Sequence, residues 1–207
     1  MKNIEYGQMA EVYDLLYKNK KYENEVEFLN SFIPNKSAQI LDAGCGTGTH
    51  SKILYDLGYI NLSGFDLNED MLKVARTKLS TPLKCDNLLT FCENTKYDVI
   101  ISMFAVFNHL KNYKEFKQAL SNLKSALKPN GIIIIDLHNP LKSGKKIETF
   151  DNITRIMKWK KCKLLQKEFS KITYIIENKK LTACHIFKIY NINKLNKIAL
   201  DLGFTSV

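Results

Sequence analysis

The chain has 207 residues, of which 45% are hydrophobic and 25% are charged, a composition typical of globular proteins. This length suits one domain of moderate size with a buried core. Residues 1–8 are polar, and no apolar segment of the kind found in signal peptides follows them. No apolar run is long enough to cross a bilayer. These features argue against a secreted protein and against a membrane-spanning one.

The five cysteines are scattered, and they form no Cys-x-x-Cys pair and no Cys/His spacing typical of a metal site. An odd and scattered set is typical of reduced thiols inside a cell. We therefore expect a cytoplasmic protein with no metal site and no membrane partner.

The formal net charge is +10, from 31 Lys and Arg against 21 Asp and Glu, so an anionic partner must be considered. Lysines occur along most of the chain and are densest over residues 142–180, around Trp159. Nucleic-acid binding is one interpretation. A solvated basic surface is the favoured one, because runs of charge usually mark exposed faces. A small anionic substrate would need only two or three of these lysines.

In chain order, residues 9–31 carry apolar side chains at helical spacing, which predicts one or two helices before Pro34 and Asn35 break the pattern. Residues 39–42 are predicted to form a strand that runs into a glycine cluster, and a helix ended by Gly58 follows. Further strands are predicted at residues 62–67, 83–85, 97–104 and 132–137, and helices at residues 69–79 and 113–127.

This alternation of strands and helices predicts βαβ units, that is, a Rossmann-like parallel sheet with helices on both faces. Residues 132–137 are apolar on both faces, as central parallel strands are. After Pro140, β-branched and aromatic residues alternate over residues 154–190, which predicts a small antiparallel insertion with a turn at residues 177–180. A final helix, residues 193–202, ends at Gly203, where another strand is expected to begin.

The glycine cluster contains Gly44, Gly46 and Gly48, spaced G-x-G-x-G between a strand and a helix. Such glycines allow a tight turn and let a ligand approach the backbone. The spacing differs from the G-x-G-x-x-G of dinucleotide-binding folds, which seats a pyrophosphate. Asp66 ends the second strand about 20 residues after Gly46, where a carboxylate can accept both ribose hydroxyls. Asp86 ends the third strand, where an acid can meet the adenine amino group.

Each of these features alone has a plain structural alternative. The glycines could form an ordinary turn, Asp66 could be the N-cap of the helix after it, and Asp86 could lie in a surface turn. Their coincidence at the carboxyl ends of adjacent strands, where open parallel sheets bind ligands, favours a nucleoside-bearing cofactor without pyrophosphate, namely S-adenosylmethionine (SAM).

The series ILDAGCGTGTH, GFDLNEDML, CDN, YDVIISMF and LKPNGIIIID resembles the motifs of class I SAM-dependent methyltransferases over residues 39–137. YGQMAEVYDLLY, KKY and MFAVFNHL, together with CHIFKIY and residues 195–204, resemble the deoxysugar-amine N-methyltransferases, to which the glycine/sarcosine methyltransferases are similar. That family acts on nucleotide-linked amino sugars.

The resemblance implies roles for particular residues. Tyr6 and His109 would face the methyl acceptor, and His109, with an ordinary pKa near about 6.5, would be able to take its proton. A packed aromatic residue (Tyr6) and a helix-entry residue (His109) remain the structural alternatives, and His138 is a weaker candidate on the acceptor side. The residues implied to bind SAM are Tyr13, Tyr22, Gly44, Gly46, Asp66, Leu67, Met71, Asp86, Asn87 and Met103.

The resemblance fails after the fifth strand, where the family has an aromatic, acidic stretch and this chain has Asp136-Leu-His-Asn-Pro140. Because that segment should help to form the acceptor pocket, the identity of the acceptor stays open. We expect a methyltransferase acting on an N or O atom of a small molecule, such as an anionic or nucleotide-linked amino sugar. The alternatives are an RNA methyltransferase and a non-catalytic SAM-binding partner subunit. Nucleic acid is disfavoured as a partner, and a homodimer is left open.

We therefore predict a single methyltransferase domain over residues 1–207. Its expected parts are an N-terminal helical lid (1–35), a SAM-binding core (36–140), a substrate-side antiparallel insertion (141–190), and a final helix with the start of a strand (191–207).

Overall fold

The computed structural model describes residues 6–138, 142–177 and 179–205, with residues 6–9 and 11 described by their backbone alone. The start of a strand expected at the end of the chain falls partly on residues 206–207, outside the described part, and Phe204 and Thr205 are not in a strand. No helix among the described residues is both long and apolar enough to cross a membrane.

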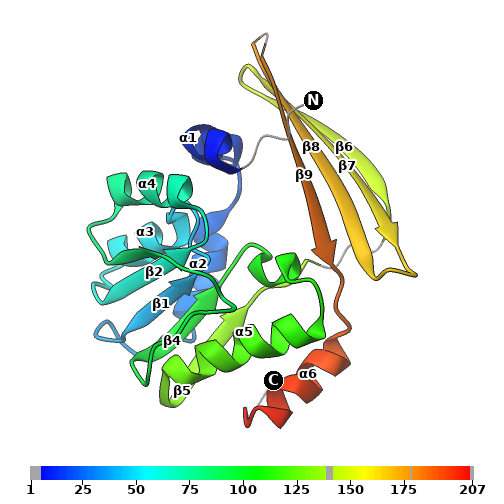
Figure 1. Cartoon of the computed structure of the whole chain (residues 1–207). Helices are drawn as coiled ribbons and strands as arrows, with labels where there is room; N and C mark the ends of the chain where they lie inside the picture. Colours follow the sequence, from blue (N-terminus) through cyan, green and yellow to red (C-terminus); the bar gives the residue numbers. More distant parts are fainter. Residues whose placement is uncertain (1–5, 139–141, 178, 206–207) are drawn as a thin grey trace.

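A parallel five-stranded sheet forms the body of the molecule (Figure 1). Its strands are β1 (Ile40–Ala43), β2 (Leu62–Asp66), β3 (Leu83–Cys85), β4 (Tyr97–Ser102) and β5 (Leu127–Ile135), in the order β3-β2-β1-β4-β5. All four neighbouring pairs are parallel. The strand order reverses between β1 and β4, and such a switch point opens a crevice at the carboxyl ends of the strands.

Helices cover both faces of this sheet. They are α1 (Tyr6–Leu16), α2 (Tyr22–Asn30), α3 (Thr49–Asp56), α4 (Glu69–Lys78), α5 (Tyr113–Ala126) and α6 (Ile192–Asp201), with a 3₁₀ turn, η1 (Val106–His109), after β4. Ile100 of β4 belongs to the core cluster that contains Phe116 of α5 and Leu195 of α6. Its neighbours Val99 and Ile101 belong to the opposite cluster, with side chains of α2 and α3. Because successive strand residues point to opposite faces, each strand buries side chains on both. The predicted Rossmann-like fold is confirmed.

The structure corrects the prediction for β5. The strand begins at Leu127, which pairs with Tyr97 before an irregularity in register, so that residues 128–131 lie within the strand instead of only ending a helix. β5 is also an edge strand instead of a central one, and residues 132–135 are only half-buried. Its apolar residues alternate between the two core clusters, which explains why the segment is apolar on both faces.

A second, antiparallel sheet follows in the chain. It contains β6 (Gly144–Phe150), β7 (Ile153–Cys162), β8 (Lys167–Ile176) and β9 (Lys179–Lys188), joined in sequence order as a meander. The predicted antiparallel segment is confirmed, and its first strand, β6, lies before the alternating residues 154–190. The sheet projects beyond the carboxyl ends of the parallel strands (Figure 1).

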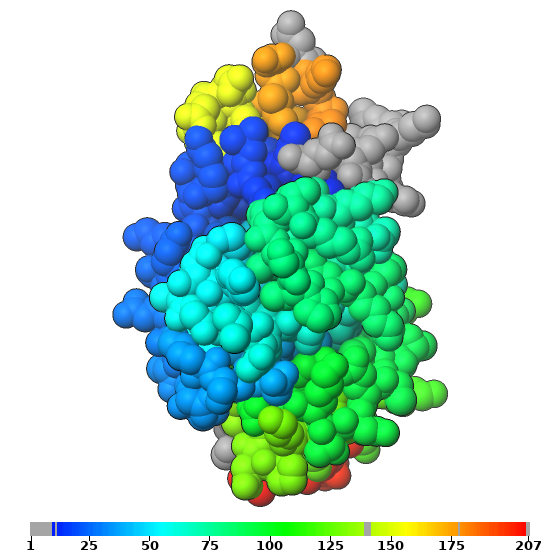
Figure 2. Space-filling view, turned by 90° about the vertical axis from the view of Figure 1, so that its left-hand side faces the viewer, coloured from blue at the N-terminus to red at the C-terminus, as the bar shows by residue number. Residues whose placement is uncertain are grey.

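Helix α1 lies between the two sheets. Leu16 packs in a core cluster with Ile153 of β7, Tyr174 of β8 and Ala183 of β9, and the same helix contacts α4. Figure 2 shows α1 in dark blue below the tips of the antiparallel strands and above the body of the molecule. The helix therefore closes the space above the parallel sheet from one side.

The fully buried side chain of Asn108 joins the two sheets. Its Nδ2 donates to the carbonyl oxygen of His138, beyond β5, at 2.9 Å, and to that of Lys188, at the end of β9, at 2.7 Å. Its Oδ1 accepts from the backbone N–H of His138 at 2.8 Å. One amide thus pairs three buried or half-buried backbone groups from two separate segments.

Replacing Asn108 by leucine, which has a similar volume, should leave these three backbone groups without partners. An unpaired buried polar group costs about 1–3 kcal/mol, so we expect the free energy of unfolding to fall by about 3 kcal/mol. Urea unfolding followed by circular dichroism measures the change. The matched control is Asn193→Leu, at an exposed position of α6, which should change stability by less than about 0.5 kcal/mol. Equal effects of the two substitutions would contradict this role for Asn108.

Candidate active site

The loop between β1 and α3 places backbone atoms against a large cavity. Gly44 and Gly46 have φ of 83° and 54°, in the left-handed region that favours glycine. A Cβ at Gly44 would lie 2.7 Å from the γ-carbons of Val106, whereas a Cβ at Gly46 would meet nothing within 4 Å. The backbone is thus tightly packed at Gly44 and open at Gly46.

Asp66, at the end of β2, receives two backbone N–H groups. Gly46 donates to Oδ2 at 2.8 Å and Asn68 donates to Oδ1 at 2.8 Å. Burial raises the pKa of Asp66 above its ordinary value, and these hydrogen bonds offset part of the rise. Asn68, and not Asp66, is the N-cap of α4, because its side chain accepts from the N–H of Asp70. The carboxylate is therefore held in place with acceptor capacity left for a ligand.

Asp86 and Asn87 follow β3, the neighbouring strand. Burial opposes ionisation of Asp86, but the ammonium of Lys84 at 2.7 Å and the N–H of Asn87 at 2.8 Å lower its pKa below the ordinary value. Asn87 fixes its own side chain by accepting from the N–H of Leu89 at 2.9 Å. Two polar side chains of defined orientation thus stand beside Asp66 at the carboxyl ends of the strands.

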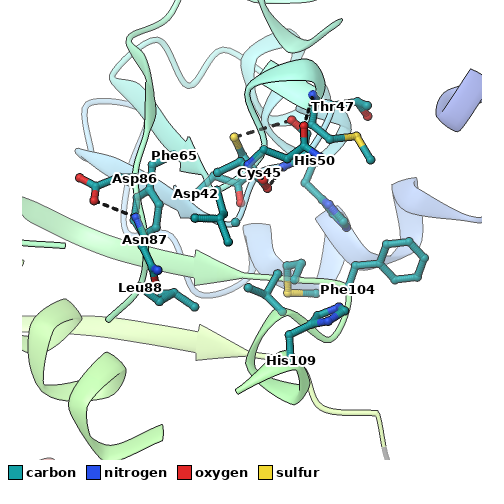
Figure 3. A pocket seen from close by; sticks show the side chains of 18 of the residues that line it. Asp42, Cys45, Thr47, His50, Phe65, Asp86, Asn87, Leu88, Phe104 and His109 are labelled. Carbon is teal, nitrogen blue, oxygen red and sulfur yellow. Dashed lines mark hydrogen bonds between the residues drawn. The ribbon is translucent and has the colours of Figure 1, made fainter. Parts of the chain in front are cut away.

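The first cavity has a volume of about 1400 Å³ and brings together eleven of the twelve candidate residues (Figure 3). Tyr6 is the exception: it begins α1, and its side chain lies outside the described residues. The candidates that line the cavity are Tyr13, Tyr22, Gly44, Gly46, Asp66, Leu67, Met71, Asp86, Asn87, Met103 and His109. Asp86 and Asn87 stand at one end of the view in Figure 3, and His109 and Phe104 at the other.

Asp14, which the sequence did not single out, fastens α1 over this cavity. Its carboxylate accepts from Thr47 Oγ1, in the glycine loop, at 2.6 Å and from Lys78 Nζ of α4 at 2.6 Å. These contacts bridge 33 and 64 positions in the sequence, so no local pattern could have revealed them. They hold α1, which carries Tyr13, close to the loop.

Glu25 of α2 supports the wall formed by Tyr22 and His50. It accepts from His50 Nε2 at 2.7 Å and from Lys20, and these partners lower the pKa of Glu25 to about 2. The rings of Tyr22 and His50 meet edge to face with centroids 5.0 Å apart. Glu25 thus fixes the imidazole of His50, which lines the cavity beside Tyr22.

A strained turn separates the first cavity from a second one. Phe104 and Ala105 have φ of 70° and 62°, which ends β4 at Ser102, two residues earlier than predicted. Asp136 stabilises the turn by accepting from the N–H of Ala105 at 2.6 Å. Left-handed backbone at two successive non-glycine residues is costly, and such strain is concentrated at functional sites.

The second cavity, about 1010 Å³, lies between this turn, α1 and the antiparallel sheet. Tyr13, Phe104 and His109 line both cavities, so these three residues stand between the two spaces, at what we call the junction. Burial and the neighbouring His185 lower the pKa of His109 to about 4. The sequence-based expectation that His109 has an ordinary pKa is therefore wrong: the imidazole is neutral at neutral pH and a weak proton acceptor.

The first cavity fits SAM by the chemistry of its lining. Asp66 suits a ribose diol, Asp86 and Asn87 suit the edge of an adenine, and Leu67, Met71 and Leu88 offer apolar surface to its faces. The absence of an obstructing atom around Gly46 gives a ligand access to the loop backbone. His50, held by Glu25, lines the cavity beside Tyr22, where the two side chains suit a carboxylate.

Comparison with known proteins agrees with this chemistry. Residues 40–131 match the family described as "Methyltransferase domain". The chain is 29% identical over 136 residues to dTDP-3-amino-3,6-dideoxy-alpha-D-glucopyranose N,N-dimethyltransferase of Streptomyces fradiae, covering 63% of this chain and 53% of that protein. It is 31% identical over 134 residues to glycine/sarcosine N-methyltransferase of Halorhodospira halochloris, covering 61% and 50%. The chain thus spans about half the length of these curated relatives.

Solved structures share the fold over most of the chain. Streptomyces venezuelae DesVI has a TM-score of 0.81 at 20% identity, covering 98% of this chain and 91% of that one. SAM-bound CalS10, an amino pentose methyltransferase from Micromonospora echinaspora, has a TM-score of 0.80 at 18% identity with the same coverages. The motif series, the strand order, the site chemistry and these matches agree with one another, and together they support a class I SAM-dependent methyltransferase.

Proposed function

We propose that this protein transfers a methyl group from SAM to a nitrogen or oxygen atom of a small molecule, with a nucleotide-linked or otherwise anionic amino sugar as the first acceptor to test. The observation that carries the proposal is the junction of two cavities at Tyr13, Phe104 and His109. One cavity suits the cofactor, and the other has the volume of a small-molecule pocket. The amino-sugar relatives support the choice of acceptor.

In this proposal the residues of the first cavity hold SAM in an extended pose. Asp66 binds the ribose, Asp86 and Asn87 bind the adenine edge, and Leu67 and Met71 contact its faces. At the opposite end, Tyr13 and Tyr22 hold the carboxylate of the methionine moiety, with Gly44 and Gly46 along the moiety and the Met103 carbonyl on its amino group. When bound, SAM supplies an electrophilic methyl group on a positively charged sulfur.

The chain's own contribution is orientation and exclusion of water. Alignment of an acceptor with the methyl group can supply about 7–11 kcal/mol of the barrier reduction. We propose that Tyr6 and His109 orient the acceptor atom at the junction. Because burial keeps His109 neutral, its imidazole adds no positive charge beside the sulfonium. The N-terminal helices act as a lid over the site in this proposal, held by the contacts of Asp14.

Methylation of RNA remains the alternative enzyme, motivated by the +10 charge. The exposed lysines Lys158 and Lys160 lie on the antiparallel sheet, but the other face of that sheet lines a cavity of small-molecule size. A non-catalytic SAM-binding subunit is the second alternative. Binding of SAM without turnover of any small-molecule acceptor would favour it.

The cofactor assignment predicts that Asp66→Ala weakens SAM binding by about 100-fold, because hydrogen bonds to a charged group contribute about 1.5–3 kcal/mol each. Calorimetric titration with SAM measures the dissociation constant. The control, Asp56→Ala, removes an exposed aspartate that is paired with Lys52 on α3 and should bind as the wild type does. Binding that is unchanged in the Asp66 variant, or absent in the wild type, would overturn the assignment.

Because the pKa of His109 is lowered in the folded protein, we expect the free energy of unfolding to depend on pH. Between pH about 6.5 and about 4, the unfolded chain binds a proton that folded His109 does not bind, so the free energy of unfolding falls as the pH is lowered. The His109→Gln variant lacks this contribution. Urea unfolding at pH 7 and pH 5 should show the wild type losing more of its free energy of unfolding than the variant does. Equal losses would mean that His109 is protonated in the folded protein.

A further inference from the structure

The second cavity contains a buried carboxylate, Glu168 of β8, whose exposed fraction is 2%. Oε2 of Glu168 lies 3.1 Å from Nε2 of His138, and no other side chain in the described part of the chain pairs with it. A buried carboxylate is costly unless it is paired. His138 therefore provides the buried carboxylate of Glu168 with a hydrogen-bond partner, and both residues line the cavity.

The other carboxylates of the described cavity lining are already bound. Asp136 accepts from the N–H of Ala105 at 2.6 Å. Glu148 pairs with both Lys146 and Arg155. Glu168 is thus the carboxylate of the described cavity lining whose side-chain partner is an imidazole.

His138 is held from two sides. The amide of Asn108 binds the N–H of His138 at 2.8 Å and its carbonyl oxygen at 2.9 Å, while Glu168 binds the imidazole. An ionised carboxylate only accepts hydrogen bonds, so Nε2 of a neutral His138 carries the proton. Nδ1 is then the nitrogen with a free lone pair. Glu168 also stabilises the imidazolium that forms when Nδ1 takes a proton.

The other histidines of this cavity are less suited to take a proton. Burial lowers the pKa of His109 to about 4 and also lowers the pKa of His185. His138 differs because its imidazole faces the carboxylate of Glu168. The rings of His138 and His109 both contact Phe187, with centroid distances of 5.5 and 4.9 Å. His138 therefore lies in the second cavity, and the ring of Phe187 contacts both it and His109 at the junction.

We propose that His138 is the proton acceptor for an ammonium-bearing methyl acceptor, and that Glu168 is its positioning residue. This inference rests on the proposed function. The ammonium nitrogen loses one proton to Nδ1 of His138 and becomes a neutral amine with a lone pair. That lone pair forms the bond to the incoming methyl group, while the sulfur of SAM keeps the electron pair of the bond that breaks. The proton on His138 then leaves to solvent through the exposed side of the ring.

The first test needs no acceptor. Long-range ¹⁵N–¹H spectra of the full-length protein at a pH where the ring is neutral distinguish the two imidazole tautomers, and single His→Gln variants assign the four histidines. We expect His138 to carry its proton on Nε2, and Glu168→Leu, which removes the acceptor, to abolish this preference. The control is Glu177→Leu, in the exposed turn between β8 and β9, which should leave the spectrum of His138 unchanged. A proton on Nδ1 in the wild type, or no effect of Glu168→Leu, would overturn the inference.

The second test is kinetic and uses dTDP-3-amino-3,6-dideoxy-α-D-glucopyranose first, then simple primary amines and hydroxyl compounds. General base catalysis contributes about 10²–10⁴-fold, so kcat should fall about 100-fold in His138→Ala, with the SAM dissociation constant within about twofold of the wild type. Added imidazole should restore part of the rate of this variant. An unchanged kcat, or a wild type that methylates only hydroxyl compounds, would overturn the inference. Failure of the wild type to bind SAM would instead contradict the proposed function. The tautomer test would then decide alone whether Glu168 orients His138.

Discussion

The side-chain amide of Asn108 is the interaction on which the arrangement of the two sheets depends. It binds the backbone of His138, just beyond β5, and the carbonyl oxygen of Lys188, at the end of β9. Because the hydrogen bond to Lys188 is buried and the two to His138 are partly buried, breaking one without a replacement is costly. The antiparallel sheet is thereby fixed against the carboxyl ends of the parallel strands, and its side chains form one wall of the second cavity. The same amide positions His138 within it.

The distribution of charge in the two cavities follows their proposed tasks. Asp66 and Asp86 lie in the first cavity, where their oxygens suit the hydroxyl and amino groups of a nucleoside. Glu168 lies in the second, paired with His138. Between them stands His109, which burial keeps neutral. A neutral junction does not repel the two cations that must meet there, a sulfonium and an ammonium, and a carboxylate on the acceptor side attracts the second of them.

The sequence predicts the parts of this protein that depend on local pattern. Apolar periodicity identifies the alternating strands and helices, and the carboxyl ends of neighbouring parallel strands necessarily meet, so Gly46, Asp66 and Asp86 could be placed in one site. Properties set by burial could not be predicted. The pKa of His109 depends on side chains of the antiparallel sheet. The edge position of β5 depends on strand order, which the apolar pattern of residues 132–137 does not encode.

Contacts between segments that are far apart in the chain could not be predicted from the sequence either. Asn108 and Lys188 are 80 residues apart, and His138 and Glu168 are 30 apart. Glu168 did leave one signal in the sequence: it shares a strand face with Ser170 and Ile172, so a carboxylate falls on the face that the period-2 pattern assigns to the interior. A charged residue at such a position is a reason to look for a partner.

The central claim is that cofactor and acceptor meet at the junction of the two cavities. Nuclear Overhauser effects from the methyl group of ¹³C-methyl-labelled SAM, bound to the full-length protein, test it most directly. We expect nuclear Overhauser effects from this methyl group to the ring protons of Phe104 and His109, which line both cavities. Effects confined to Leu88 and Asn87, at the opposite end of the first cavity (Figure 3), would place the methyl group away from the junction and contradict the account.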